Sequence, residues 1–257
     1  MDETIHYAHH GAVAVITYDR PARRNAWNVE CVRAVIAAIG MANDDPAVGA
    51  IILTGRGDAF CAGVDLKSPS ALDPVTGRRL TLATFTMGEG ERNWITLLAR
   101  SKPVIAAVNG AAVGIGATHI LAADIRIAAR TANFSFPFLK RGMMPECGSS
   151  ALLPRIVGSG RAMDLFLRGD TLSAQEALDI GLVTALHDDL GLLPAALALG
   201  QQIAALPSLQ VRLTKSTMSS NAGIDDADKI MRTESDAFLN MFRAQRAAAA
   251  PTSGDSG

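Results

Sequence analysis

Four short runs of β-branched and small apolar residues alternate with longer helical patterns between residues 12 and 130. The runs are residues 12–19, 49–55, 102–110 and 123–130, each of a length typical of a buried strand. Residues 28–44 show helical spacing after Asn28, a residue type that caps helix N-termini well, and residues 75–100 predict another helix. Strands that alternate with helices predict an α/β fold.

The strand patterns stop after about residue 190. Residues 192–205, 208–219 and 224–246 read as three helices, separated by the turn sequences "LPS" and "NAG". We therefore expect an α/β core over residues 1–190 and a C-terminal helical region over residues 191–257, whose last residues form a frayed tail.

Composition excludes several classes of function. A formal net charge of -1 over 257 residues gives no electrostatic footprint for nucleic acid or an anionic membrane. No stretch approaches ~18 uninterrupted apolar residues, and "MDETIHYAHH" lacks a signal-peptide pattern, so a cytoplasmic protein with a small-molecule partner is expected. The 3 cysteines lack CxxC spacing, which argues against disulfides and a zinc site.

Two glycine-rich loops follow predicted strands. In "VNGAAVGIGATHI" (108–120) His119 occupies the third glycine position of a dinucleotide fingerprint, so the loop does not predict nicotinamide binding. Small residues at a helix start instead let backbone N–H groups approach a negatively charged oxygen. The loop "GRGDAFCAGVDLK" (55–67) offers a second such turn. Together the loops can aim two N–H groups at one oxygen, the arrangement that stabilises an enolate.

Glu146 is the acid within "GMMPECGSSALLPRIVG" (142–158), just before an apolar helix. One interpretation is structural, because a carboxylate at a helix N-terminus interacts favourably with the free N–H groups and the helix dipole. The other interpretation is catalytic. The residue alone leaves both open.

Several motifs occur together and in order: "RPARRNAWN" (20–28), "FCAGVDL" (60–66), "VNGAAVGIG" (108–116) and the Glu146 segment. With "SAQEALDIGLV" (173–183) and "VRLTK" (211–215), they make the chain resemble the crotonase, or enoyl-CoA hydratase/isomerase, superfamily from about Tyr7 to Phe242. The resemblance implies a spiral of β-β-α units, with a C-terminal helical region that makes trimer contacts. It also implies an acyl-CoA substrate, no metal, no redox cofactor, and a homotrimer or hexamer.

The resemblance also implies site residues. The oxyanion-hole donors would be the backbone N–H groups of Ala62 and Ile115. The residues expected to contact coenzyme A or the acyl group are Arg24, Ala62, Val64, Asp65, Leu66, Gly114 and Phe138.

The acids of family hydratases fall at Thr118 and Phe138 in this chain, where no carboxylate stands. Family members that shift a double bond place one acid in a segment such as "PEGC" or "PDCG", and "PECG" around Glu146 is similar. The resemblance thus implies an enzyme of fatty-acid metabolism that converts a 3-enoyl-CoA to a 2-enoyl-CoA. An atypical hydratase, a silent acyl-CoA-binding protein, and ring-isomerising or dehalogenating chemistry stay open.

Three further expectations concern other parts of the chain. His119 is predicted to be a buried structural residue, and neither Cys61, Cys147 nor Ser149 has a motif that activates a nucleophile. Part of a set of aromatic and methionine residues beside the acid is expected to line an acyl channel, and the alternative is that they belong to the core: Phe134, Phe136, Phe138, Met143 and Met144. Apolar residues of the last helices are expected to be buried between subunits: Leu213, Ile230, Phe238 and Phe242.

Overall fold

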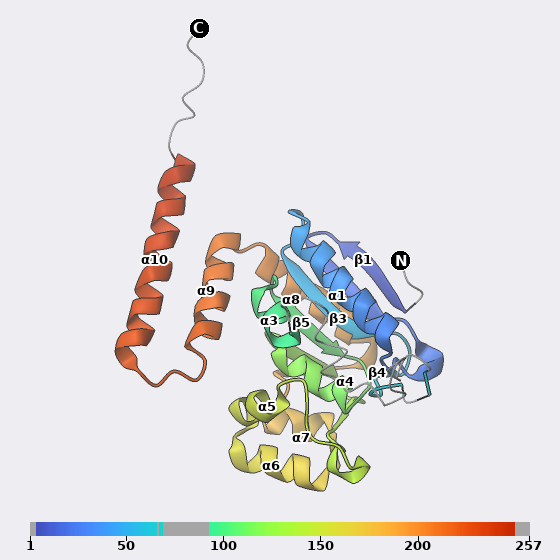
Figure 1. The fold of residues 1–257 in the computed structure, drawn as a ribbon. Helices are drawn as coiled ribbons and strands as arrows, with labels where there is room; N and C mark the ends of the chain where they lie inside the picture. Colours follow the sequence, from blue (N-terminus) through green and yellow to red (C-terminus); the bar gives the residue numbers. More distant parts are fainter. Residues whose placement is uncertain (1–3, 66, 69–92, 250–257) are drawn as a thin grey trace, which may run out of the picture. The chain divides into compact units, whose positions relative to one another are not determined.

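Two β-sheets form the framework of the computed structural model, which describes residues 4–65, 67–68 and 93–249 (Figure 1). The first sheet has the strand order β1 (Ile5–His10), β2 (Val13–Tyr18), β3 (Ala50–Gly55), β5 (Val104–Val108), β7 (Ile125–Ala129) and β10 (Ala185–His187). The second has the order β4 (Ala59–Cys61), β6 (Ala111–Val113), β8 (Asn133–Ser135) and β9 (Thr171–Ser173). Only the pairs β1/β2 and β8/β9 are antiparallel; the other neighbours in these two sheets are parallel.

The chain passes repeatedly from the first sheet to the second. Strand β3 is followed by β4, β5 by β6, and β7 by β8. The four predicted strands correspond to β2, β3, β5 and β7, which are the inner strands of the first sheet. Inner strands are covered on both faces, which explains their continuous apolar sequences. The outer strands β1 and β10 are less buried and carry a weaker sequence pattern.

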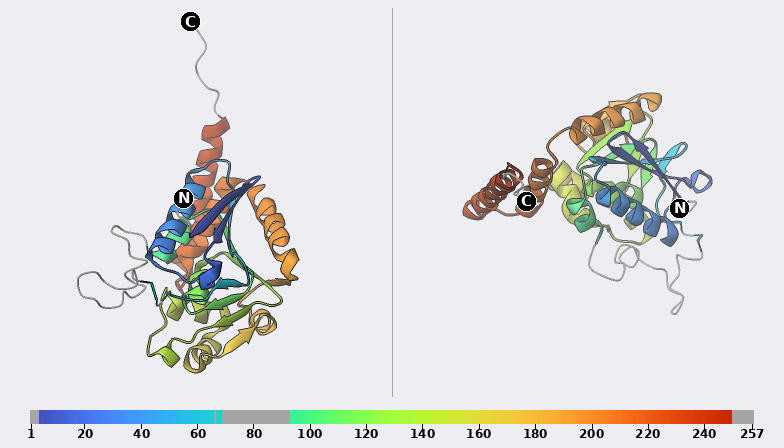
Figure 2. Two further views of the ribbon diagram at one scale, coloured as in Figure 1. Left: turned by 90° about the vertical axis from the view of Figure 1, so that its right-hand side faces the viewer. Right: turned by 90° about the horizontal axis from the view of Figure 1, so that it is seen from above.

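Helices α1 (Val29–Asp44) and α8 (Asp189–Ala204) lie on opposite faces of the first sheet (Figure 2). Helix α1 begins after Asn28, whose side chain accepts a hydrogen bond from the Cys31 N–H at 2.9 Å, as the sequence predicted. Helix α8 approaches the sheet closely at Gly200, where a Cβ would stand 3.0 Å from a Val13 methyl group. The remaining helices up to residue 179 are η1 (Pro21–Arg23), α3 (Trp94–Arg100), α4 (Ile115–Thr118), η3 (His119–Ala122), η4 (Leu139–Arg141), α5 (Ser149–Val157), α6 (Ser159–Arg168) and α7 (Ala174–Asp179). Most of the helix predicted over residues 75–100 lies outside the described residues.

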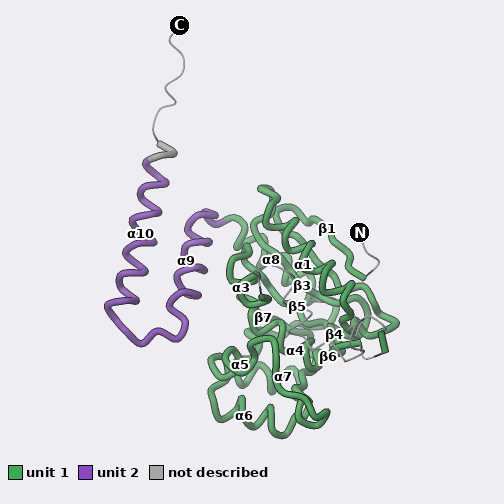
Figure 3. The backbone as a smooth tube through the Cα atoms, viewed as in Figure 1, with its two compact units in different colours: residues 1–205 green, residues 206–257 purple. Residues whose placement is uncertain are grey.

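The chain divides into two compact units, residues 1–205 and 206–257 (Figure 3). The boundary falls after Ala205, later than the residue 190 expected from the sequence, because α8 packs on β2, β3, β5 and β7 of the first unit. The second unit consists of α9 (Ser208–Asn221) and α10 (Ala227–Ala249), which pack on each other. No single described helix is long and apolar enough to cross a membrane, although α8 and α9 pass that test as a bent pair.

Candidate active site

The two glycine-rich loops follow parallel neighbouring strands and lie against each other. Strand β4 pairs with β6 in parallel, so the loops that follow both strands leave the same edge of the second sheet. A Cβ at Gly116 would stand 2.0 Å from the Cys61 carbonyl oxygen, and one at Gly63 would stand 3.2 Å from the Val113 oxygen. Only glycine allows the backbones to approach so closely at residue 116. The predicted convergence of the loops is present.

Helix α4 begins inside this contact, at Ile115. Gly114 is its N-terminal cap residue with φ 57°, a left-handed conformation that favours glycine, and the Gly114 N–H donates to the Ser135 oxygen at 2.9 Å. The first N–H groups of a helix have no acceptor within the helix. Among the described residues the Ile115 N–H has no backbone acceptor. Its role as an oxyanion-hole donor stays a prediction.

The N–H of Ala62 does not fit the role expected for it. It donates to the carbonyl oxygen of Arg24 at 3.0 Å, and Arg24 has a left-handed backbone conformation (φ 49°). An N–H that is already bonded to a backbone oxygen is a poor donor to a substrate. The hydrogen bonding of this loop therefore corrects the assignment of Ala62 and moves attention to the next N–H groups of the loop.

Val64 presents its N–H in a different direction. It forms an isolated parallel bridge with Trp27, in which the Trp27 N–H donates to Gly63 O at 2.8 Å and the Asp65 N–H donates to Trp27 O at 2.7 Å. In such a bridge the central residue, Val64, turns its own N–H away from the paired segment. No backbone acceptor for this N–H is present in the described part of the chain. Val64, predicted only as a coenzyme A contact, thus offers a backbone N–H that has no acceptor among the described residues and points away from Trp27.

Glu146 lies in the loop that leads into α5, and its side chain is half-buried. Its carbonyl oxygen accepts from the Ser149 N–H at 3.1 Å. Cys147 (φ 57°) and Gly148 (φ 71°) are both left-handed and turn the chain before the helix. Gly148 is the cap residue of α5, the cap makes no side-chain hydrogen bond, and no acidic residue stands in the first turn. Glu146 therefore precedes the cap residue of α5, and its catalytic role stays a prediction.

The loop that carries Glu146 leads into helix α5, which packs on the continuation of α4. A Cβ at Gly148 would stand 2.1 Å from the Ile95 Cδ1 atom of α3. Helices α3 and α5 both pack on η3, which continues the helix that starts at Ile115. The acid-bearing loop and the Ile115 turn are thus attached to one set of packed helices.

The positions that carry acids in family hydratases hold apolar or neutral groups inside the molecule. Phe138 is 2% exposed, and Thr118 is fully buried at the end of α4. The Thr118 and Ser149 hydroxyl oxygens are buried with no hydrogen-bond partner among the described residues. Buried hydroxyl groups usually have a partner in the protein or in bound water, so these two hydroxyl groups could bind water or a ligand.

His119 is a buried structural residue, as predicted. Its ring stacks on Phe60 at 5.5 Å between ring centroids, and it is fully shielded from solvent. Burial lowers the pKa of His119 to about 4, although the hydrogen bond with the Ile115 oxygen acts in the opposite direction. The imidazole is therefore neutral at pH 7.

The two cysteines of the site are not activated either. Burial raises the pKa of the Cys61 thiol to about 12. Burial and the nearby negative charge of Glu146 raise the pKa of Cys147 to about 12 as well. Both side chains are thiols at neutral pH, and the thiolate is the nucleophilic form. This agrees with the expectation that neither is a nucleophile.

The residues expected to contact coenzyme A have different surroundings. Arg24 is exposed, whereas Asp65 is buried in an ion pair with Arg20 (Nη2 to Oδ2, 2.9 Å). Leu66 lies outside the described residues. Arg20 was not identified from the sequence, although it is the first residue of the quoted segment "RPARRNAWN". In the described ranges no group of three His, Cys, Asp or Glu side chains gathers that could hold a metal ion.

The residues expected to line an acyl channel separate into two groups. Phe134, Phe136 and Phe138 are buried, and Phe136 packs edge-on against Phe166. Met143 and Met144 are exposed beside them, Met144 to 80%. The channel itself remains a prediction.

The chain is similar in sequence to proteins of the enoyl-CoA hydratase/isomerase family. The family profile described as "Enoyl-CoA hydratase/isomerase" matches residues 8–252. The chain is 39% identical over 212 residues to the 1,2-epoxyphenylacetyl-CoA isomerase of Escherichia coli, covering 81% of this chain and 79% of that protein. It is 37% identical to the crotonyl-CoA hydratase of Syntrophomonas wolfei, covering 91% and 87%.

Solved structures give the same result for the fold. An enoyl-CoA hydratase subunit from Geobacillus kaustophilus superposes with a TM-score of 0.83 at 31% identity, covering 93% of this chain and 90% of that one. The predicted spiral fold is confirmed.

Proposed function

Because the chain belongs to the enoyl-CoA hydratase/isomerase family, we propose that it is an enoyl-CoA isomerase that converts a 3-enoyl thioester to the 2-enoyl thioester. The observation that carries this proposal is the set of acids. Glu146 is half-buried in the loop before α5, whereas Thr118 and Phe138 stand where hydratases of the family carry carboxylates. A double-bond shift requires one base, whereas hydration requires a base for water and an acid for carbon.

The proposed reaction uses Glu146 and two backbone donors. The Glu146 carboxylate removes a proton from C2, and the electron pair moves into the thioester to form a dienolate. The Val64 and Ile115 N–H groups bind the dienolate oxygen, which carries the negative charge. The Glu146 carboxyl group then returns the proton to C4, and the double bond forms between C2 and C3. No atom is gained or lost, so no co-reactant is needed.

The two groups contribute comparable parts of the rate. A positioned general base typically contributes about 10²- to 10⁴-fold. One oxyanion-hole donor typically contributes about 10²- to 10³-fold. Loss of either should therefore be measurable in a direct assay.

The test replaces Glu146 by Gln, which keeps size and polarity but removes the basic oxygen. Isomerisation of a 3-enoyl-CoA should fall by about 10²-fold or more, because no base remains. Affinity for a saturated acyl-CoA should change by no more than a few fold, because the backbone donors are unchanged. Glu234→Gln, an exposed change on α10, is the matched control. Turnover by Glu146→Gln within a few fold of wild type would reject the base.

Hydration is the second candidate. It is favoured by the 37% identical crotonyl-CoA hydratase and by the unpartnered Thr118 and Ser149 hydroxyls, which could hold water. The same purified protein should be offered a 2-enoyl-CoA, and formation of a 3-hydroxyacyl-CoA should be followed. Hydration faster than isomerisation would favour this alternative, and binding without turnover of either ester would indicate a silent acyl-CoA-binding protein.

A further inference from the structure

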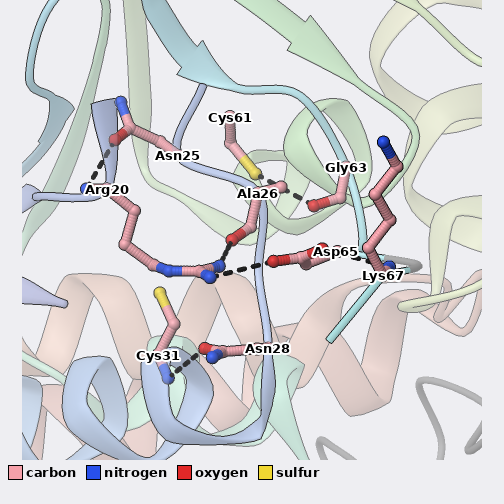
Figure 4. A network of polar contacts seen from close by, with 9 residues as sticks. All are labelled: Arg20, Asn25, Ala26, Asn28, Cys31, Cys61, Gly63, Asp65 and Lys67. Atoms are coloured by element: carbon pink, nitrogen blue, oxygen red, sulfur yellow. Dashed lines mark hydrogen bonds and ion pairs between the residues drawn. The ribbon is translucent and has the colours of Figure 1, made fainter. Parts of the chain in front are cut away.

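The Arg20 guanidinium lies beside the Ala26 carbonyl group and the Asp65 carboxylate (Figure 4). Its Nη1 donates to the Ala26 carbonyl oxygen, and its Nη2 donates to Asp65 Oδ2 at 2.9 Å. The Arg20 backbone N–H also donates to Asn25 Oδ1 at 2.9 Å. Arg20 thus contacts two segments that are about 40 residues apart in the sequence.

The ion pair is shielded from solvent. The side chain of Arg20 is 16% exposed and that of Asp65 is 8% exposed. Burial alone would raise the pKa of Asp65, but hydrogen bonds from the Arg20 guanidinium and the Lys67 N–H outweigh burial and lower it. The carboxylate is therefore ionised at neutral pH, and its bond to the planar guanidinium has a defined direction.

The two acceptors of Arg20 flank the bridge that orients Val64. Asp65 directly follows Val64, and Ala26 directly precedes Trp27, whose backbone is paired with the Val64 loop. A single guanidinium therefore fixes the two sides of the bridge against each other. The bridge determines where the Val64 N–H points. A shift of either the Trp27 segment or the Val64 segment would therefore change the direction of this N–H.

We propose that Arg20 is a positioning residue for the oxyanion hole and acts through Asp65 and Ala26. This inference rests on the proposed role of the Val64 N–H. It predicts different effects on a charged and on a neutral ligand, because the oxyanion hole interacts most strongly with a fully charged oxygen. Loss of Arg20 should weaken stabilisation of an enolate much more than it weakens binding of a neutral thioester.

The experiment uses acetoacetyl-CoA, a 3-oxoacyl thioester whose C2 proton is acidic and whose enolate absorbs in the near ultraviolet. The enolate fraction of the bound ligand is measured against pH in wild type and Arg20→Met, and the Kd of butanoyl-CoA is measured in parallel. We expect the pKa of the bound ligand to rise by about one to two units, the equivalent of a tenfold to 100-fold weaker hole. The Kd of butanoyl-CoA should change by less than about threefold.

Two further variants separate positioning from general damage. Arg20→Lys keeps the charge but loses the forked pair of donors, so its enolate pKa should fall between the values of wild type and Arg20→Met. Asp65→Asn keeps the shape and removes the charge, so it should act in the same direction even if Arg20→Met fails to fold. Arg168→Met, which removes the exposed pair with Asp170, is the matched control.

The proposal is overturned if folded Arg20→Met or Asp65→Asn leaves the enolate pKa unchanged, or weakens both ligands by the same factor. This readout does not depend on Glu146 turnover. If wild type lowers the enolate pKa and Arg20→Met reverses the shift, the inference stands even where no isomerase activity is found. If the wild-type protein turns over a 3-enoyl-CoA but the pKa of the bound ligand is the same in wild type and Arg20→Met, the isomerase proposal survives and this inference fails.

Discussion

The ring of His119 is hydrogen-bonded to the backbone of Ile115, four positions earlier in the sequence. The Ile115 N–H is one of the two proposed oxyanion-hole donors. His119 Nδ1 and the Ile115 carbonyl oxygen are 2.6 Å apart, and His119 Nε2 is 2.9 Å from the Tyr18 hydroxyl. Since a carbonyl oxygen can only accept, the proton is assigned to Nδ1, and Nε2 accepts from Tyr18. The neutral imidazole therefore ties the first turn of α4 to strand β2.

The free energy of unfolding should depend on pH because of the buried His119 imidazole. The folded-state pKa of His119 is lowered to about 4, below its ordinary value of 6.5, so the unfolded chain binds the proton more readily. The contribution of His119 to the free energy of unfolding is therefore complete above pH 6.5. It is lost as the pH falls toward 4, and the total loss is about 3 kcal/mol.

Urea unfolding at several pH values between 7.5 and 4.5 measures this dependence. His119→Asn keeps a donor near the Nδ1 position and cannot titrate, so its stability should fall less steeply over the same range. Equal slopes for the two proteins would show that His119 does not contribute.

The close contact between the two loops predicts the effect of an added methyl group at Gly116. In Gly116→Ala the new Cβ would stand 2.0 Å from the Cys61 oxygen, so the backbones must separate and the two donors must move apart. Isomerisation should fall by about 100-fold, as expected for a misplacement of about 1 Å at a reacting centre. Steady-state kinetics with a 3-enoyl-CoA test this.

The matched control is Gly160→Ala in α6, where a Cβ would meet nothing within 4 Å. This variant should keep full activity and gain about 0.5–1 kcal/mol, because alanine suits a helix better than glycine. If Gly116→Ala turned over substrate as fast as wild type, the distance between the two loops would not determine the position of the oxyanion-hole donors.

The acyl channel can be tested by shortening a buried ring beside the acid. Phe138→Leu should lower the free energy of unfolding by about 1–2 kcal/mol, because it removes buried contacts. If Phe138 also lines the acyl site, the ratio of kcat/KM values for long and short acyl chains should rise at the same time. Phe134→Leu in β8, equally buried, should destabilise the protein without changing that ratio. If each variant changed kcat/KM by the same factor for every acyl chain length, Phe138 would belong to the core alone.

The apolar surface of α10 predicts self-association. Phe238 and Phe242 are 62% and 51% exposed, and their rings contact each other with centroids 6.2 Å apart. Exposed apolar surface of this kind commonly marks an interface between subunits. We expect an oligomer in sedimentation velocity and dissociation in Phe238→Asp/Phe242→Asp. Met163→Asp, the same type of change on α6, should leave the oligomer intact, and a monomeric wild-type protein would contradict the prediction.

The sequence by itself determined the parts that depend on local patterns. Strands β2, β3, β5 and β7 were predicted because they are inner strands with apolar residues on both faces. Helix α1 was predicted from its spacing and its Asn28 cap, and the two glycine loops from their position after strands. The prediction that Glu146 is the base came from the resemblance to the family, which also placed the acids of hydratases at Thr118 and Phe138.

Only the tertiary structure decided which backbone donors are free and what holds them in place. The Ala62 N–H is engaged because Arg24 lies opposite it, and the Val64 N–H is free because its neighbours bond to Trp27. Residues 24–27 and 62–65 meet through folding, so no local pattern could show that Arg20 would bind Asp65. A hydrogen bond depends on direction and distance between atoms, and between distant segments these are set by the packing of the whole chain.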